Sequence, residues 1–203
     1  MKSFNNSITR IRRTGATRGN RSGAKNSFEQ GDLDRLCGVY VIVNAVKQLC
    51  PALNDSAHKE LFEAMMTALR MRDQYRRPII IMGMSCSQLV GLIALAFDHL
   101  RRQYGINLVA RRIGKSVAGK WGIGVLWGFL DQRLGSDCVA ILGLAGRHNH
   151  WTLATAVTPR QLRLADSDGL HVLKRHLTTT RPKRCNMRLA CITADMVILV
   201  RRL

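Results

Sequence analysis

The sequence predicts an α+β fold in which helices come first and an antiparallel sheet follows. Across most of residues 55–134 the large apolar side chains recur at helical spacing. From residue 137 onward, short apolar runs of strand composition alternate with turn residues. Helices followed by strands are the order of an α+β domain, and 203 residues suit one such domain with a tail.

The first apolar run, residues 37–50, leaves two interpretations open. Its β-branched valines and isoleucine favour a strand, but the continuous apolar character also suits a buried helix. A helix capped by Asp55 or Ser56 is predicted next. Its apolar face consists of Leu61, Phe62, Met65, Met66 and Leu69.

A stretch of nineteen residues without a charge, Ile79–Phe97, reaches the length of a membrane span. Within it, however, Ser85 and Gln88 have the spacing of a capping box. We therefore expect no membrane span but a helix from about Ser87 to Gln103 that ends near Gly105.

Beyond residue 105 the sequence predicts one more helix and several strands. Residues 106–111 look extended, and a helix over 125–134 is expected to end at Gly135 in the left-handed C′ position. Strands are then predicted over residues 137–145, 150–157, 161–165 and 190–200.

Positive charge is the most unusual property of the composition. There are 32 Lys and Arg residues against 13 Asp and Glu, which gives a net charge of +19 and a pI near 11.0. Residues 1–29 are polar and carry seven of the basic residues, so we expect a disordered basic tail before a folded domain at 30–203. The arginine pairs are scattered and have no interleaved aromatics or nucleic-acid motif. The charge favours an acidic partner or non-specific contact with nucleic acid.

The cysteines and the first residues indicate a reducing compartment. No secretory signal precedes the apolar runs, and the six cysteines include no CxxC pair. We therefore expect a cytoplasmic protein with free thiols. No cofactor or metal is expected, because His171, His176, Cys185 and Cys191 match no usual ligand spacing.

Three segments carry residues suited to chemistry: Gln30 to Cys37-Gly38, His148-Asn-His150-Trp151, and Asp166-Ser167. A thiolate is the nucleophilic form of cysteine, and a helix N-terminus with a nearby imidazolium stabilises it. A carboxylate behind the imidazole fixes the orientation of the ring. Cys37, His150 and Asp166 are the residues we expect in these three positions. His148 and Asp168 remain alternatives for the base and its partner.

The ordered set Gln, Cys, His, Asp resembles the papain-like cysteine protease superfamily. The resemblance covers about residues 30–170 and is strongest for bacterial C39-like peptidases and Ulp-type isopeptidases. It implies that residues 38–49 form a central helix with the Cys37 nucleophile at its start, packed on a C-terminal antiparallel sheet. It also implies His150 as base, Asp166 as the residue that orients it, and Gln30 as an oxyanion donor. Gln30 stands seven residues before Cys37, whereas about six is usual in the superfamily.

The expected activity is hydrolysis of a peptide or isopeptide bond in a peptide or protein substrate, acidic or ubiquitin-like. A transferase or deamidase of the same fold uses the same thioester chemistry. The alternative from another class is a non-enzymatic basic module that binds nucleic acid or an acidic protein, with Cys37 a buried structural thiol.

Overall fold

A computed structural model describes residues 36–71, 83–113, 121–146, 148–181 and 189–203. The predicted tail, residues 1–29, and the predicted oxyanion donor Gln30 lie outside the described residues.

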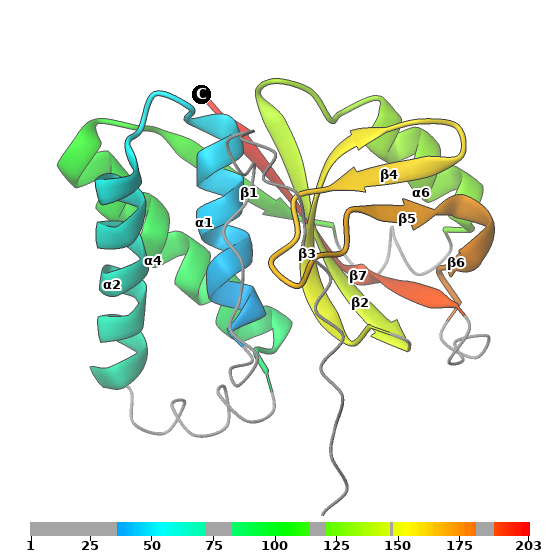
Figure 1. The fold of residues 1–203 in the computed structure, drawn as a ribbon, viewed down its shortest axis with the longest axis horizontal. Helices are drawn as coiled ribbons and strands as arrows, with labels where there is room; N and C mark the ends of the chain where they lie inside the picture. The colour runs from blue at the N-terminus through cyan, green and yellow to red at the C-terminus, as the bar shows by residue number, and fades with distance from the viewer. Residues whose placement is uncertain (1–35, 72–82, 114–120, 147, 182–188) are drawn as a thin grey trace, which may run out of the picture.

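Three helices lead the described chain, β1 and α6 follow, and the remaining strands come last (Figure 1). The helices are α1 (Cys37–Leu49), α2 (Asp55–Met71), α4 (Cys86–Tyr104) and α6 (Ile123–Asp131). The strands are β1 (Leu108–Arg112), β2 (Cys138–Gly146), β3 (His150–Val157), β4 (Gln161–Leu164), β5 (Val172–Lys174), β6 (Thr178–Thr179) and β7 (Ala190–Arg202). A short 3-10 turn, Arg175–Leu177, joins β5 to β6. The predicted α+β class is confirmed.

The strands form one sheet in the order β1-β7-β2-β3-β4-β5, with antiparallel neighbours throughout this path. The short β6 pairs with β7 in parallel. Strand β7, the last in the chain, therefore lies inside the sheet between β1 and β2. The Arg202 guanidinium near its end also donates a hydrogen bond to the Leu49 carbonyl, at 3.2 Å, where α1 ends.

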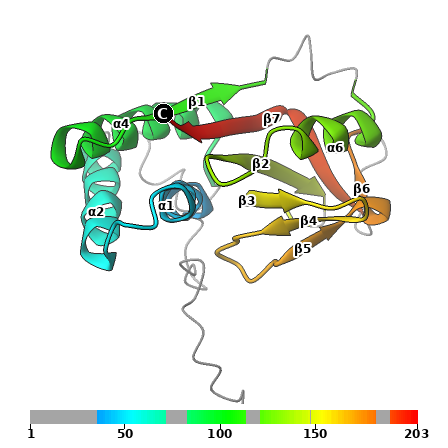
Figure 2. The same cartoon turned by 90° about the horizontal axis from the view of Figure 1, so that it is seen from above.

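The apolar run at residues 37–50, for which both a strand and a buried helix were possible, forms helix α1. Ten of its thirteen residues are buried, which explains why its sequence is apolar on every side. It contacts α2 and α4 on one side and β2, β3 and β7 on the other, as Figure 2 shows from above. A helix forms its backbone hydrogen bonds internally, so it can be enclosed in this way without leaving polar groups unpaired.

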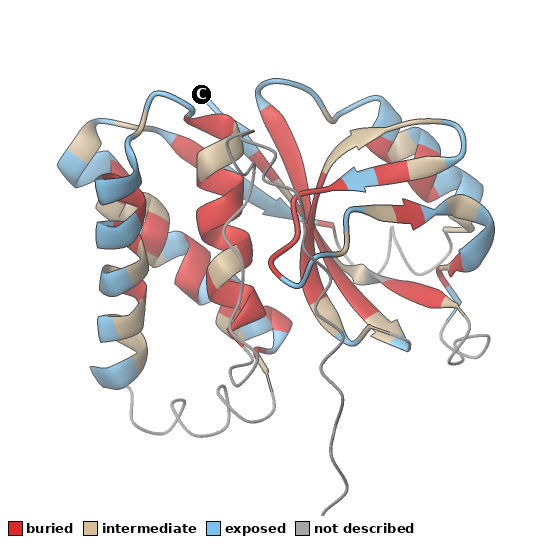
Figure 3. Cartoon of the chain, in the orientation of Figure 1, coloured by how far each residue is buried: buried red, intermediate tan, exposed pale blue. Residues whose placement is uncertain are grey.

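The central strands are buried on both faces of the sheet (Figure 3). Along β2, Val139 and Ile141 pack with α1, α2 and α4, whereas Ala140 and Leu142 pack with α6 on the opposite face. This alternation follows from the two-residue period of a strand. It explains why β2 reads as a continuous apolar run rather than an alternating one.

Gly143, in β2, leaves room for the side chains of Met196 and Trp151 to pack close to its backbone. A Cβ on Gly143 would lie 2.6 Å from Cβ of Met196 and 3.1 Å from the ring of Trp151. The pairing of β2 with β7 shifts register between Leu142 and Leu144, at this same residue. The absent side chain thus makes room for Trp151, which adjoins the candidate site.

Helix α4 begins and ends as the sequence predicts. Ser85 accepts from the Gln88 amide, the Gln88 side chain accepts from the Ser85 amide, and Gly105 closes the helix in the left-handed conformation. The uncharged stretch therefore contains a helix start, although residues 79–82 lie outside the described ranges. Among the described helices, none combines the length and apolar character that crossing a membrane takes.

Two predicted helix ends are wrong. For α2 the cap is Asn54, whose side-chain oxygen accepts from the Ala57 amide at 2.9 Å, rather than Asp55 or Ser56. Helix α6 ends at Asp131, and Gln132 rather than Gly135 follows it as the C-cap. The Gly135 amide instead donates to the Cys138 carbonyl in the turn that leads to β2.

Candidate active site

Cys37 is the first residue of α1 and is 6% exposed. Leu36 precedes it as the N-cap and makes no side-chain capping hydrogen bond. The first amides of a helix lack carbonyl partners within the helix, and negative charge is stabilised at this end. The fold therefore places the sulfur where a helix favours an anion.

The start of α1 is held against the sheet by Met84 and Trp151. A Cβ on Gly38 would lie 2.9 Å from the sulfur of Met84 and 3.2 Å from its Cβ, so the bare glycine admits this side chain. Trp151, on β3, donates from Nε1 to the Met84 carbonyl at 2.7 Å. These contacts connect the helix that begins with Cys37 to the strand that begins with His150.

His150 and Asp166 meet at one end of the β3–β4 pair. The two strands are antiparallel, with Ala154 opposite Leu164, so the start of β3 lies beside the residues that follow β4. Nε2 of His150 is 3.0 Å from Oδ2 of Asp166, and the two side chains are 10% and 0% exposed. The imidazole is therefore fixed at one nitrogen in a nearly dry environment.

The Asp166 carboxylate is itself oriented by the backbone. Its Oδ1 accepts from the amides of Asp168 at 2.7 Å and Leu170 at 3.3 Å. Burial by itself would raise the pKa of Asp166, but the hydrogen bond and charge of His150, with the Asp168 amide, outweigh it and lower the pKa. Asp166 is thus a carboxylate that belongs both to a turn and to the pair with His150.

The His150 ring lies between two anionic or hydrogen-bonding partners. Burial by itself would lower the pKa of His150. The hydrogen bonds and charges of Asp166 and Cys37 outweigh this effect and raise the pKa to about 10. The structure thus brings Cys37, His150 and Asp166 together, and the surroundings favour the imidazolium form.

No protein-family model matches the sequence. No curated protein matches it either. The fold is similar to that of a bacterial peptidase domain. This is the peptidase domain of Streptococcus ComA, a bi-functional ABC transporter involved in a quorum-sensing pathway. The match covers 88% of this chain and 97% of that domain, at 14% identity and a TM-score of 0.45.

The alternatives that the sequence left open occupy different positions. His148 lies in the loop before β3, where Asn149 adopts a φ of 44°, and His150 is the histidine bonded to Asp166. The Asp168 side chain is exposed, and the residue contributes its amide to Asp166.

The sequence did not predict that Met84 belongs to the surroundings of the site or that its side chain packs against Gly38. The Trp151 hydrogen bond to the Met84 carbonyl joins positions 67 residues apart, so no local pattern predicts it. The glycine directly after the candidate cysteine is the sequence feature that could have indicated this contact, since glycine permits close approach by another segment.

We expect the His150 imidazole to stay protonated far above its ordinary pKa of 6.5, up to about pH 10. Ring-nitrogen NMR of the folded chain measures this titration. Asp166→Asn removes the neighbouring charge and should lower the His150 pKa. A His150 ring that titrates near 6.5 in both proteins would contradict the geometry.

The raised pKa of His150 also makes the free energy of unfolding depend on pH. Because the His150 pKa is raised on folding, its contribution is fully present below pH 6.5 and is lost as pH rises toward 10. The free energy of unfolding should therefore fall over this range, and less steeply in Asp166→Asn. Denaturant unfolding at several pH values checks this slope.

Proposed function

We propose that this protein is a cysteine peptidase or isopeptidase with Cys37 as nucleophile, His150 as acid and base, and Asp166 as the residue that orients His150. One observation carries the proposal. An imidazole that is only 10% exposed is bonded through Nε2 to a buried carboxylate, and it also interacts with a thiol at the first residue of a buried helix. These are the parts that an activated thiol requires.

The reaction follows from these positions. The Cys37 thiolate attacks the substrate carbonyl carbon, and the π electrons move to oxygen. When the oxyanion collapses, the C–N bond breaks and the leaving amine takes a proton from the His150 imidazolium. Because Asp166 engages Nε2, Nδ1 is the nitrogen available for this transfer.

Deacylation completes the cycle. Water attacks the thioester carbonyl while His150 accepts a proton from the water. The C–S bond then breaks, which releases the carboxylic acid product and regenerates the Cys37 thiolate. The Cys37 backbone amide at the start of α1 is suited to donate to the oxyanion, and Gln30 remains the predicted second donor. An amine that replaces water at this step would make the protein a transferase. The net charge of +19 favours an acidic substrate.

Labelling with a peptide-derived electrophile, followed by mass-spectrometric mapping, tests the proposal. Cys86 is an internal control, because it is also the first residue of a helix and is 7% exposed. Burial raises the pKa of the Cys86 thiol, and no imidazole is among the groups that act on it. We expect Cys37 to react at least about a hundredfold faster, as a positioned base provides. Equal labelling of both residues, or labelling of neither, would contradict the proposal and favour the non-enzymatic basic module.

A further inference from the structure

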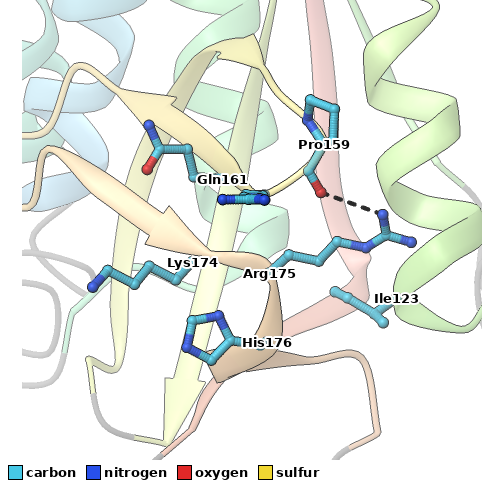
Figure 4. Close-up of a pocket in the computed structure, with 7 residues that line it drawn as sticks. Ile123, Pro159, Gln161, Lys174, Arg175 and His176 are labelled. Atoms are coloured by element: carbon cyan, nitrogen blue, oxygen red, sulfur yellow. Dashed lines mark hydrogen bonds between the residues drawn. The ribbon is translucent and has the colours of Figure 1, made fainter.

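A second candidate site lies at the other end of β3. A pocket of about 630 Å³ opens there, formed by the turn after β3, the end of β5 and the start of α6 (Figure 4). The eight residues of β3 separate it from His150, a length of roughly 25 Å. The volume is within the roughly 300–1,000 Å³ typical of small-molecule sites.

The walls of this pocket are fixed by hydrogen bonds. The Arg175 amide donates to the Arg160 carbonyl at 2.8 Å, and the Arg175 guanidinium reaches the Pro159 carbonyl at 3.4 Å. Trp127 of α6 donates to the Thr158 carbonyl at 3.0 Å. The turn after β3, the end of β5 and α6 are therefore tied together before any ligand arrives.

Several basic side chains line the pocket, and no carboxylate is among the described residues that line it. The basic side chains that line it are Arg160, Lys174, Arg175 and His176. Within the described ranges none of the four forms an ion pair with a carboxylate, whereas Arg101, Arg112 and Arg201 each have an aspartate partner. The three permanent cations among them, Arg160, Lys174 and Arg175, raise the local concentration of anions.

The remaining lining is polar on one side and apolar on the other. Gln161 lies opposite Lys174 in the antiparallel pairing of β4 with β5 and contributes an amide. Ile123 and Pro159 form an apolar wall, and Figure 4 shows them on the opposite side of the pocket from Gln161 and Lys174. Figure 4 also shows the Arg175 guanidinium on the side of Ile123 and Pro159, so the pocket offers positive charge beside its apolar wall as well as at Lys174.

We propose that this pocket binds the phosphates of a nucleotide-sized polyphosphorylated small molecule. Guanidinium groups match phosphate oxygens in two-point hydrogen bonds, and lysine adds a further charge. Three permanent cations call for a ligand with several negative charges, which a polyphosphate supplies and a single carboxylate does not. Ile123, Pro159 and the methylene stems of the basic side chains provide the surface for the uncharged part. The proposal is independent of the thiol chemistry.

Binding of a fluorescent ATP analogue to the full chain at about 0.15 M salt, where distant charges are screened, tests this site. The double variant Arg160→Gln, Lys174→Gln removes two of the cations and leaves Arg175, which holds the wall. The matched control Lys59→Gln, Arg70→Gln removes the same charge from exposed positions on α2. We expect the pocket variant to bind at least about tenfold more weakly, as the loss of charged hydrogen bonds implies, and the control to bind as wild type does.

Competition and unfolding measurements complete the test. Inorganic tripolyphosphate should displace the probe, and thermal unfolding should be alike in the two variants because the exchanged side chains are exposed. If the double variant does not fold, Lys174→Gln alone carries the comparison. The proposal is overturned by a lack of saturable binding, by equal weakening in both variants, or by displacement with hexaglutamate but not tripolyphosphate.

Discussion

Cys37→Ala is expected to abolish peptide hydrolysis while the protein stays folded. The substitution removes the atom that bonds to the substrate carbonyl, and loss of the nucleophile in a comparable triad costs about 10⁶ in kcat. The cost in stability should be only about 1 kcal/mol, since a single buried sulfur is removed. Turnover of a peptide substrate and circular dichroism, measured on the same preparation, give the two results.

Cys86→Ala is the matched control for this experiment. Cys86 has the same place in α4 that Cys37 has in α1, and the two residues are almost equally buried. Turnover should stay near that of the wild type, because no imidazole is among the described groups that act on the Cys86 thiol. Equal losses in the two variants would mean that burial of a thiol, and not its chemistry, matters for this chain.

His150 substitution is expected to have the next largest effect. His150→Gln keeps an N–H donor toward Asp166 but has no titratable nitrogen, so turnover should fall by about 10²–10⁴ while the fold persists. His150→Ala leaves a buried carboxylate without its partner, which costs about 3–5 kcal/mol in comparable buried pairs. The alanine variant should therefore also unfold more readily than the glutamine variant.

The control for His150 is the neighbouring His148→Gln. His148 precedes β3 and is not the histidine bonded to Asp166, so the variant should retain most of its turnover. A loss confined to His148→Gln, with His150→Gln active, would transfer the role of base to His148.

The sequence was most informative where local chemistry sets the structure. The capping box at Ser85 and the helix stop near Gly105 are contained within a few residues, and both were predicted correctly. The end of α6 was not, because Gly135 is equally suited to the turn before β2, where it lies. Strand β5 has three residues, too few for a periodic pattern to be recognised.

Prediction of the candidate site depended on both pattern and resemblance. Periodicity could not distinguish helix from strand in residues 37–50, because a segment enclosed on all sides is apolar in either conformation. The papain-like resemblance implied the helix, and the structure has it at Cys37–Leu49. Contacts such as Trp151 with Met84 join segments distant in the sequence, and a single sequence carries no record of them.

The place of β7 has a consequence for the timing of assembly. Residues 190–202 follow every other described element, yet they lie inside the sheet between β1 and β2 and reach the end of α1 through Arg202. Chains leave the ribosome N-terminus first, and contacts between distant segments form late. A nascent chain therefore carries Cys37, His150 and Asp166 well before β2 has the neighbour that completes its layer. Before residues 190–202 are synthesised, β1 and one edge of β2 lack the strand with which each pairs in the folded sheet, so the sheet cannot be completed earlier.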